Sequence, residues 1–399
     1  MAGAAGGRRG FWPPERAVAP ARSGRDSGLV LAQTHSDEFH ALQAAVRAVG
    51  TNRLAAVSPH PDRTGVIPHD ALQALGGMGL LTPRAVDDGG EGVPDHLAWT
   101  MIAEELATAD AGTALDVVLG AYAAVIVGRC GTDEQRRRLA ALGDTERGTV
   151  LYFEGFGRSP LELETTASPA GAGWVLAGRK TAVVRARTSS FGIAFARSGT
   201  DLLAFLLPAS SLAALVVERD DGASGKPGAR SAATSTVELT PAAAAELLGG
   251  GAPLDRHRNV AGMRLAIASI LVGVGAAAVR YAAHYASGRE AFGRTIAAFQ
   301  GVAFPLVETE MAIEAARVAI RDLAADVEHI DDAVALASRT GEAVAAAAHA
   351  ASVATTTAVN TLGGHGYLTD HPVERWYRDV AVLAAIDFDP LLTEWSAGR

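Results

Sequence analysis

The sequence predicts an α+β protein with a helical N-terminal domain, a central antiparallel β-domain and a C-terminal four-helix bundle. Three observations predict this order. Apolar residues recur at three- and four-residue spacing up to about Gly131, which is typical of helices. After Gly148, short segments rich in β-branched and aromatic residues alternate with Gly, Ser, Pro and Asp, as strands and turns do. From about Arg256 onward, long alanine-rich helical patterns return.

The first 34 residues differ from the rest of the chain. They are rich in Gly, Ala, Arg and Pro, and they lack the apolar stretch of a secretory signal. We expect residues 1–34 to form a disordered or extended segment. The expected domains are then residues 35–148 for the helical domain, 149–250 for the β-domain and 251–399 for the bundle.

The N-terminal helices are expected in segments with helical apolar spacing. The segment TDEQRRRLAAL opens with a capping box formed by Thr132 and Gln135, which marks a helix start. The one cysteine, Cys130, follows the apolar run AYAAVIVG, so we expect a buried structural thiol rather than a nucleophile. Because no disulfide is possible, a reducing cytoplasm is the expected compartment. Three further helices are predicted in DEFHALQAAVRAVG, HDALQALGGMGLL and DHLAWTMIAEELATA.

The β-domain is expected from five short segments bounded by turn formers. The later stretch DDGASGKPGARSAAT has no strand pattern and is predicted to be a loop. The five strand segments are TVLYFEG, GWVLAGRKTAVVRA, SFGIAFAR, LLAFLLP and TSTVELT.

The C-terminal helices are predicted over residues 258–287, 296–327 and 330–361, with a last helix after Pro372. Alanine is the best helix former, and its small side chain allows helices to pack closely. The segment GVGAAA formally fits a dinucleotide-binding fingerprint. It lies inside a helical pattern with no preceding strand, so we interpret it as small residues at a helix contact.

Composition and charge exclude several classes of function. The chain has 399 residues and a formal net charge of −9. A mildly acidic protein lacks the clustered Lys and Arg that general nucleic-acid binding needs. The most apolar run, LAIASILVGVGAAAV, is flanked by Arg264 and Arg280 and is shorter than the ~20 residues of a membrane-spanning helix. We therefore expect neither nucleic-acid nor membrane partners, and the scattered histidines predict no metal site.

Two stretches of the C-terminal half are richer in glycine and polar residues than a plain helix corner needs. The first, SGREAFGRTIAAFQ, contains Arg289, Phe292 and Gln300. The second, NTLGGHGYLTDHPVERWYRD, opens with three closely spaced glycines. Glycine-rich loops expose backbone N–H groups, which suit a phosphate or diphosphate that approaches the main chain.

Together these stretches resemble the acyl-CoA dehydrogenase family. The family's Arg-x-x-Phe-Gly-x-x-[Ile/Leu]-x-x-x-Gln segment matches the chain from Arg289 to Gln300. Its Gln-x-[Leu/Phe]-Gly-Gly-x-Gly-Tyr segment, followed by Pro-Val-Glu-Arg and Arg-Asp, matches the second stretch, with Asn360 in place of the Gln. The resemblance covers the helical–β–helical order of most of the chain, and its motifs are strong after Arg264.

The resemblance implies that the two segments bind the ADP half of FAD. In the family they come from different subunits across a dimer interface, so a homodimer or homotetramer is expected. A guanidinium and glycine N–H groups together satisfy a dianionic diphosphate. The residues implied to bind the cofactor in this way are Arg289, Phe292, Gln300, Asn360, Gly363 and Gly364.

The implied contacts to the flavin ring depart from the family pattern. The family's Thr-Glu-x-x-x-Gly-Ser-Asp stretch becomes FEGFGRSP, with Phe153 in place of the Thr and Ser159 keeping the Ser. Its Lys-x-Trp-Ile-[Ser/Thr] stretch becomes KTAVV, which keeps Lys180 but has Ala182 for the Trp and Val184 for the hydroxyl residue. At Phe153 and Val184 only backbone groups are left to contact the ring.

The resemblance implies that Asp387 is the catalytic base. The family removes an α-proton from an acyl thioester with a carboxylate while a hydride passes to the flavin. Asp387 falls where the family places a Glu, nine residues after the Arg at position 378, but its side chain is one methylene shorter. The Gly that follows this Glu in the family is replaced by Phe388. Some members place the base directly before Arg264, where this chain has Met263.

Three functions stay open on the sequence. A working dehydrogenase would oxidise an unusual acyl thioester, bound to CoA or to a carrier protein, in a specialised or biosynthetic pathway, and would pass electrons to an acceptor. A flavoprotein of the same fold could carry out other chemistry, such as oxygenation. A non-redox or catalytically silent member would serve as a partner subunit. In the first case the resemblance places Arg264, Tyr367 and Ser159 at the substrate.

Overall fold

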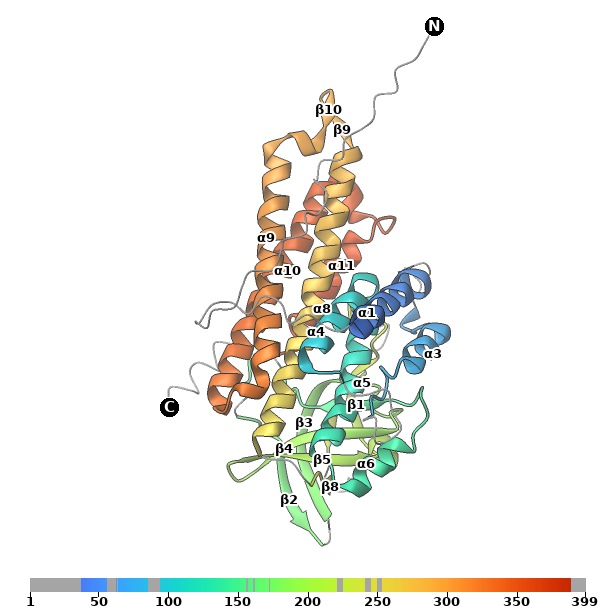
Figure 1. Cartoon of the computed structure of the whole chain (residues 1–399), viewed down its shortest axis with the longest axis vertical. Coiled ribbons are helices and arrows are strands. Elements are labelled where there is room, and N and C mark those ends of the chain that lie inside the picture. Colours follow the sequence, from blue (N-terminus) through green and yellow to red (C-terminus); the bar gives the residue numbers. More distant parts are fainter. Residues whose placement is uncertain are drawn as a thin grey trace. The chain divides into compact units, whose positions relative to one another are not determined.

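The fold of the described residues follows the order that the sequence predicts. Helices come first, then a sheet, then long helices again (Figure 1), so the expected fold class is confirmed. The extended segment expected at residues 1–34 lies outside the described residues. The computed structural model describes residues 37–55, 62, 64–84, 94–155, 157–160, 162–171, 173–220, 225–240, 245–249 and 253–388.

Helical elements form the described N-terminal part of the chain, and three of them begin at a side-chain cap. They are α1 (Asp37–Val49), the π-helical turn η1 (Gly50–Leu54), α3 (His69–Gly77), α4 (His96–Ala109), α5 (Ala111–Cys130) and α6 (Asp133–Ala140). Asp95 and Asp110 cap α4 and α5 through side-chain oxygens that accept backbone N–H groups. The capping box of Thr132 and Gln135 is confirmed at the start of α6. Cys130 is buried, as expected, and burial raises the pKa of its thiol.

The central sheet has eight strands in the order β6-β7-β3-β2-β4-β5-β8, with β1 paired to β4. Its strands are β1 (Gly148–Leu151), β2 (Thr166–Ala170), β3 (Gly173–Val184), β4 (Phe191–Ser198), β5 (Asp201–Pro208), β6 (Val216–Asp220), β7 (Thr234–Leu239) and β8 (Glu246–Leu247), with the short helix α7 (Ala209–Ala213) after β5. Strand β1 runs parallel to β4, so the sheet is mixed rather than wholly antiparallel. The sequence does not predict β2, β6 or β8, because these strands are short and two of them lack β-branched residues in their interiors.

Strand β3 is irregular near the position where the family has its Trp. The register between β3 and β7 shifts between Lys180 and Val183, and Ala182 between them has a φ of 54°. A left-handed backbone is uncommon for a residue with a side chain. Bulges of this kind bend a strand and redirect its side chains, so the irregular stretch sets the direction of the residues around the expected ring site.

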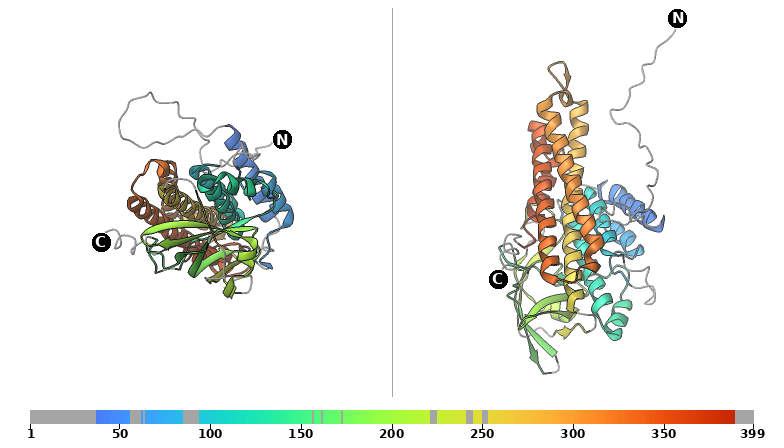
Figure 2. Two further views of the ribbon diagram at one scale, coloured as in Figure 1. Left: turned by 90° about the horizontal axis from the view of Figure 1, so that it is seen from below. Right: turned by 60° about the vertical axis from the view of Figure 1, so that its left-hand side comes forward.

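Three long helices and one shorter helix form the C-terminal part. They are α8 (Pro253–Gly288), α9 (Gln300–Asp326), α10 (Ala333–Leu362) and α11 (Val373–Leu383). The three long helices contact one another and lie side by side in Figure 1 and in the right-hand view of Figure 2. The hairpin of β9 (Glu290–Ala291) and β10 (Arg294–Thr295) joins α8 to α9 at the end of the bundle remote from the sheet (Figure 1). The four predicted helices are confirmed, except that residues 296–298 form a 3-10 turn before α9.

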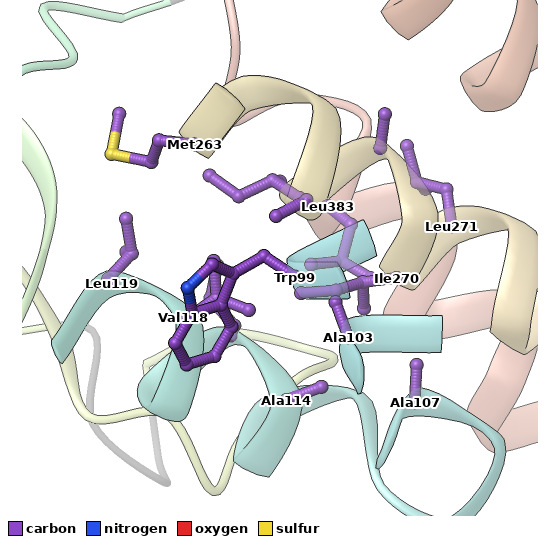
Figure 3. Close-up of a cluster of buried hydrophobic side chains, with 14 of the residues drawn as sticks. Trp99, Ala103, Ala107, Ala114, Val118, Leu119, Met263, Ile270, Leu271 and Leu383 are labelled. Atoms are coloured by element: carbon purple, nitrogen blue, oxygen red, sulfur yellow. The ribbon is translucent and has the colours of Figure 1, made fainter. Parts of the chain in front are cut away.

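Helix α8 packs against both the N-terminal and the C-terminal helices. It contacts α4, α5, α9, α10 and α11. A Cβ at Gly273 would lie 2.5 Å from the carbonyl oxygen of Glu104 on α4, and a Cβ at Gly275 would lie 2.4 Å from Ile313 on α9. The interpretation of GVGAAA as a helix contact is therefore confirmed. Figure 3 shows Trp99 of α4 among apolar side chains of α5 and α8 in this core.

Two described helices, α5 and α8, are long and apolar enough to cross a membrane by length and composition alone. The expectation that no apolar segment reaches that length is therefore wrong. The most apolar windows of α5 and α8 are 94% and 100% buried inside the protein. Packing against the other helices accounts for their composition, because a helix surrounded by protein is apolar on all faces.

Candidate functional site

The residues expected to bind the ADP half of FAD lie at one end of the C-terminal bundle. Arg289 follows α8, Gln300 opens α9, and the glycine segment follows α10. The β9–β10 hairpin marks this end (Figure 1). Arg289, Gln300 and Asn360 are exposed, so the set forms a surface of the chain rather than an internal pocket.

Two aromatic residues at this end are largely exposed. Phe292 is 95% exposed and Tyr367 is 86% exposed. Phe292 lies in the hairpin turn with a φ of 52° and contacts Phe299 edge to face. Tyr367 does not lie with Arg264 and Ser159, which are buried. The three residues expected at the substrate are therefore not brought together within one chain.

The glycines after α10 have different roles, which corrects the expectation that they all present N–H groups to a phosphate. Gly363 has a φ of 57°, and its N–H already donates to the carbonyl of Asn360. A Cβ at Gly366 would lie 2.4 Å from the carbonyl oxygen of Val359, so Gly366 is required by packing. Gly363 and Gly364 both have open space on the Cβ side, but Gly364 has neither a positive φ nor a close neighbour that requires glycine. Two of the three glycines thus serve the end of the helix.

A cluster of tyrosines and histidines fastens the glycine segment to α8. Tyr281 OH lies 2.8 Å from His371 Nδ1, and Tyr285 OH lies 3.2 Å from His365 Nδ1. The two imidazole rings are stacked, with centroids 5.5 Å apart. Sequence reasoning misses this cluster because its tyrosines lie 80 or more positions before its histidines, and the residues show no metal or catalytic spacing. Its contacts hold the glycine segment against the C-terminal part of α8.

Asp387, the expected base, is buried and paired with Arg264. The Nε of Arg264 lies 2.9 Å from each carboxylate oxygen, and the Phe388 amide donates to Oδ1 at 2.7 Å. The side chains of Arg264 and Asp387 are 1% and 7% exposed. Because both oxygens face the guanidinium, an Asp387 that removes a proton from a substrate would first have to leave this pair.

Aromatic side chains fill the space beside the ion pair. Phe388 is 2% exposed, and its ring centroid lies 5.3 Å from that of Tyr152 and 5.9 Å from that of Phe153. The guanidinium carbon of Arg264 lies 6.0 Å from the centre of the Phe388 ring. Tyr152 also contacts Phe195 of β4 edge to face, and burial raises the pKa of Tyr152. Edge-to-face clusters of this kind are typical of a packed core.

The positions expected at the flavin ring present apolar side chains. Phe153 and Val184 are buried, and Ser159 is 5% exposed. The retained Lys180 forms a buried ion pair with Glu154 at 2.8 Å, and burial lowers the pKa of Lys180 to about 8. This pair joins the segment after β1 to β3, so it fixes the strands and does not reach a ring.

Little free volume remains near Arg264 and Asp387. The cavity beside Arg264, which Tyr152 and His257 also line, measures about 20 Å³. A cavity of about 380 Å³ lies elsewhere, between α6 and strands β4, β5 and β8, and none of the expected site residues line it. Ligand pockets usually measure roughly 300–1,000 Å³, so the cavity that the described residues form beside Arg264 is too small for an acyl group.

The Arg-Asp pair of the second motif holds α11 in place. Arg378 pairs with Glu374 at 2.8 Å and with Asp62 at 3.0 Å. Asp379 is buried and accepts a hydrogen bond from the Ala229 amide at 2.6 Å. Burial raises the pKa of Asp379 to about 7. These contacts tie α11 to earlier segments, so the motif has a packing role in this chain.

Comparison with known proteins supports the resemblance along most of the chain. Models of the N-terminal and C-terminal domains of acyl-CoA dehydrogenase match residues 36–142 and 243–387. The human mitochondrial short-chain specific acyl-CoA dehydrogenase is 28% identical over 398 residues, which cover 94% of this chain and 92% of that protein. The probable acyl-CoA dehydrogenase FadE25 of Mycobacterium tuberculosis is 27% identical over 366 residues, with 87% and 90% covered.

Solved structures share the fold. Butyryl-CoA dehydrogenase from Megasphaera elsdenii has a TM-score of 0.78 at 23% identity and covers 92% of this chain and 99% of its own. The FAD complex of PigA has a TM-score of 0.78 at 16% identity, with 92% and 98% covered. FAD is the cofactor of acyl-CoA dehydrogenases. The two domain models, the relatives and the helical–β–helical order agree, and the chain belongs to the acyl-CoA dehydrogenase family.

Proposed function

We propose that this chain is an FAD-binding subunit of an oligomeric acyl-thioester dehydrogenase, and that the exposed end of its bundle binds the ADP half of the cofactor. The observation that carries the proposal is that Arg289, Gln300 and Gly364 are retained and exposed at that one end. Family membership suggests the reaction class, in which FAD, when bound, accepts a hydride from the β-carbon of an acyl thioester.

The residues at this end fit an ADP diphosphate. Arg289 supplies a guanidinium, Gln300 supplies an amide, and Gly364 supplies backbone that no side chain covers, since a Cβ there would meet nothing within 4 Å. Arg294 adds a second guanidinium, stacked 4.0 Å from the centre of the Phe299 ring. Charge-assisted hydrogen bonds from such groups to a diphosphate are strong, so we expect them to contribute most of the affinity for FAD.

The residues at the ring end fit the flavin less well. Phe153, Ala182 and Val184 offer no side-chain hydrogen bond, and Phe153 and Val184 are buried. Only backbone groups remain to contact the ring, as the sequence predicts. We therefore expect FAD to be bound mainly by its ADP half, with a loosely held ring.

Two forms of the proposal differ in where the chemistry occurs. In the first, Asp387 separates from Arg264 and removes the α-proton of a thioester carried by CoA or by a carrier protein. In the second, the chain is a non-catalytic partner subunit. The second form is favoured by a specific observation: Arg264 engages both oxygens of Asp387, and Phe388 fills the space beside them.

An exposed apolar stripe on α9 supports an oligomer. Phe304, Val307, Met311 and Val318 are between 44% and 67% exposed. Their spacing of three, four and seven residues places them on one face of the helix. Such a stripe is typical of a helix that packs against a partner. We propose that a second copy covers it in a homodimer or homotetramer.

Flavin binding by the purified full-length protein tests the proposal. Titration of FAD, followed by quenching of its fluorescence, should show that Arg289→Ala weakens binding by about 10- to 150-fold, because a hydrogen bond to a charged group contributes roughly 1.5–3 kcal/mol. Arg179→Ala, which removes an exposed arginine of β3, is the matched control and should leave the affinity unchanged.

Two results would count against the proposal. The first is a wild-type protein that takes up no flavin even with excess FAD. The second is a monomer in light scattering at micromolar concentration, because the diphosphate surface would then lack the second subunit that completes the site.

A further inference from the structure

We infer that Phe388 closes the acyl site of this chain, so that the chain supports flavin binding in its assembly without oxidising a thioester itself. The inference deepens the proposed function and rests on it, because family membership locates the acyl site beside Asp387. It selects the non-catalytic partner subunit over the self-sufficient dehydrogenase.

Phe388 directly follows Asp387, at the position where the family has a glycine. Its side chain is 2% exposed, and its amide donates to Oδ1 of Asp387 at 2.7 Å. The amide fixes the backbone against the carboxylate, so the ring has to occupy the space next to it. A glycine at position 388 would leave the volume of the phenyl ring free. An acyl chain facing Asp387 would need that volume.

The closure involves a set of rings and not one side chain in one rotamer. Tyr152, Phe153 and Phe388 each contact the other two, with centroid distances between 5.3 and 5.9 Å. Phe195 of β4 packs against Tyr152 from the sheet at 5.3 Å. Moving Phe388 out of this cluster would break contacts to two rings at once, so closure is a property of the folded core.

The charged groups complete the closure. Arg264 holds both oxygens of Asp387, and its Nη2 is buried with no hydrogen-bond partner within the described part of the chain. The adjoining cavity of about 20 Å³ is just above the roughly 10–15 Å³ that one water needs. A single water there would satisfy Nη2. A space of this size has room for about one water and does not admit an acyl group.

The test is the binding of butyryl-CoA, a short saturated acyl-CoA, to the full-length protein by isothermal titration calorimetry. Wild type should give the same weak signal as with CoA alone. Phe388→Gly should bind butyryl-CoA at least tenfold more tightly than wild type. The matched control is Phe205→Ala, which removes a fully buried ring from a separate core cluster and should gain no affinity.

The inference is overturned if wild type binds butyryl-CoA as tightly as Phe388→Gly does, or if a folded Phe388→Gly protein binds no better than Phe205→Ala. If circular dichroism shows that Phe388→Gly does not fold, Phe388→Val replaces it with the same two outcomes. FAD content is measured separately by absorbance. Absence of FAD contradicts the proposed function, whereas the heat of butyryl-CoA binding decides closure without reference to flavin.

Discussion

The ADP end and the ring end of the expected flavin site differ in how much of the family pattern they keep. At the end of the bundle, Arg289 and Gln300 keep the polar side chains and expose them. Near the sheet, Phe153, Val184 and Phe388 stand where the family has polar residues or glycine, and all three are buried. Binding a nucleotide needs a charged surface, whereas oxidising a thioester needs an open pocket with placed polar groups. The two requirements are separable, and the proposed function needs only the first.

Breaking the ion pair near the sheet should give the largest effect. Arg264→Ala leaves Asp387 as a buried charge without its partner, so we expect the free energy of unfolding to fall by about 3–5 kcal/mol in equilibrium urea unfolding. Replacing both residues, Arg264→Met with Asp387→Leu, removes both charges and should recover most of that loss. A double variant as unstable as the single one would show that the pair does not account for the stability of this region.

The packing role of the Arg-Asp motif predicts a pH dependence. Burial raises the pKa of Asp379 to about 7 from its ordinary 3.8, so between these values the folded protein holds a proton that the unfolded chain releases. This contribution to stability is complete below about pH 4 and is lost as the pH rises through about 7, by at most about 4 kcal/mol. Asp379→Asn keeps an acceptor for the Ala229 amide and should remove that part of the slope in urea unfolding from about pH 5 to 8. Parallel curves for the two proteins would refute the assignment.

Substitution of the glycines at the ADP end should distinguish Gly366, which packing requires, from Gly364, which we expect to bind the ligand. Gly366→Ala places a Cβ against the Val359 carbonyl and should destabilise the protein by about 1–3 kcal/mol. Gly364→Ala meets no neighbouring atom and should change stability by less than about 0.5 kcal/mol. Thermal unfolding of the two variants measures the difference. Equal losses would mean that the segment is held more tightly around Gly364 than its open surroundings indicate.

The smallest effect is expected from lengthening the amide at position 360. Asn360→Gln restores the family's side chain at the exposed ADP end, where one added hydrogen bond is worth about 1 kcal/mol. FAD should bind roughly fivefold more tightly, measured by the same fluorescence titration as for Arg289→Ala. A weaker affinity would indicate that Asn360 serves only the end of α10 and that FAD does not reach it.

The sequence predicts most of the fold because helices and strands have local signals. The capping box at Thr132 and the alanine-rich patterns locate helices to within a few residues. Strand β2 is missed because the interior of the segment TASPA has no β-branched residue. Its pairing with β3 stabilises the strand, and a local sequence pattern does not show that pairing. The parallel pairing of β1 with β4 is missed for the same reason.

The sequence does not predict which of the expected site residues are buried and paired. Arg289 and Gln300 are exposed at one end of the bundle, and their role in binding FAD stays a prediction. Motif spacing does not indicate that Arg264 and Asp387, 123 positions apart, form a buried pair. It also assigns the backbone of Gly363 to a phosphate, whereas the Gly363 N–H donates to the Asn360 carbonyl. These features depend on contacts between distant segments, which a local pattern does not contain.

The central place of α8 has a consequence for biosynthesis. Helices α4 and α5 bury their apolar faces partly against α8, yet α4 ends at Ala109 and α8 begins only at Pro253. At ordinary translation rates a ribosome needs roughly 10–30 s to add the residues that separate α4 from the middle of α8. During that interval α4 and α5 have left the exit tunnel without the helix that covers them. We therefore expect the nascent chain to bind a chaperone that covers the apolar faces of α4 and α5. These faces are buried only after α8 has been synthesised.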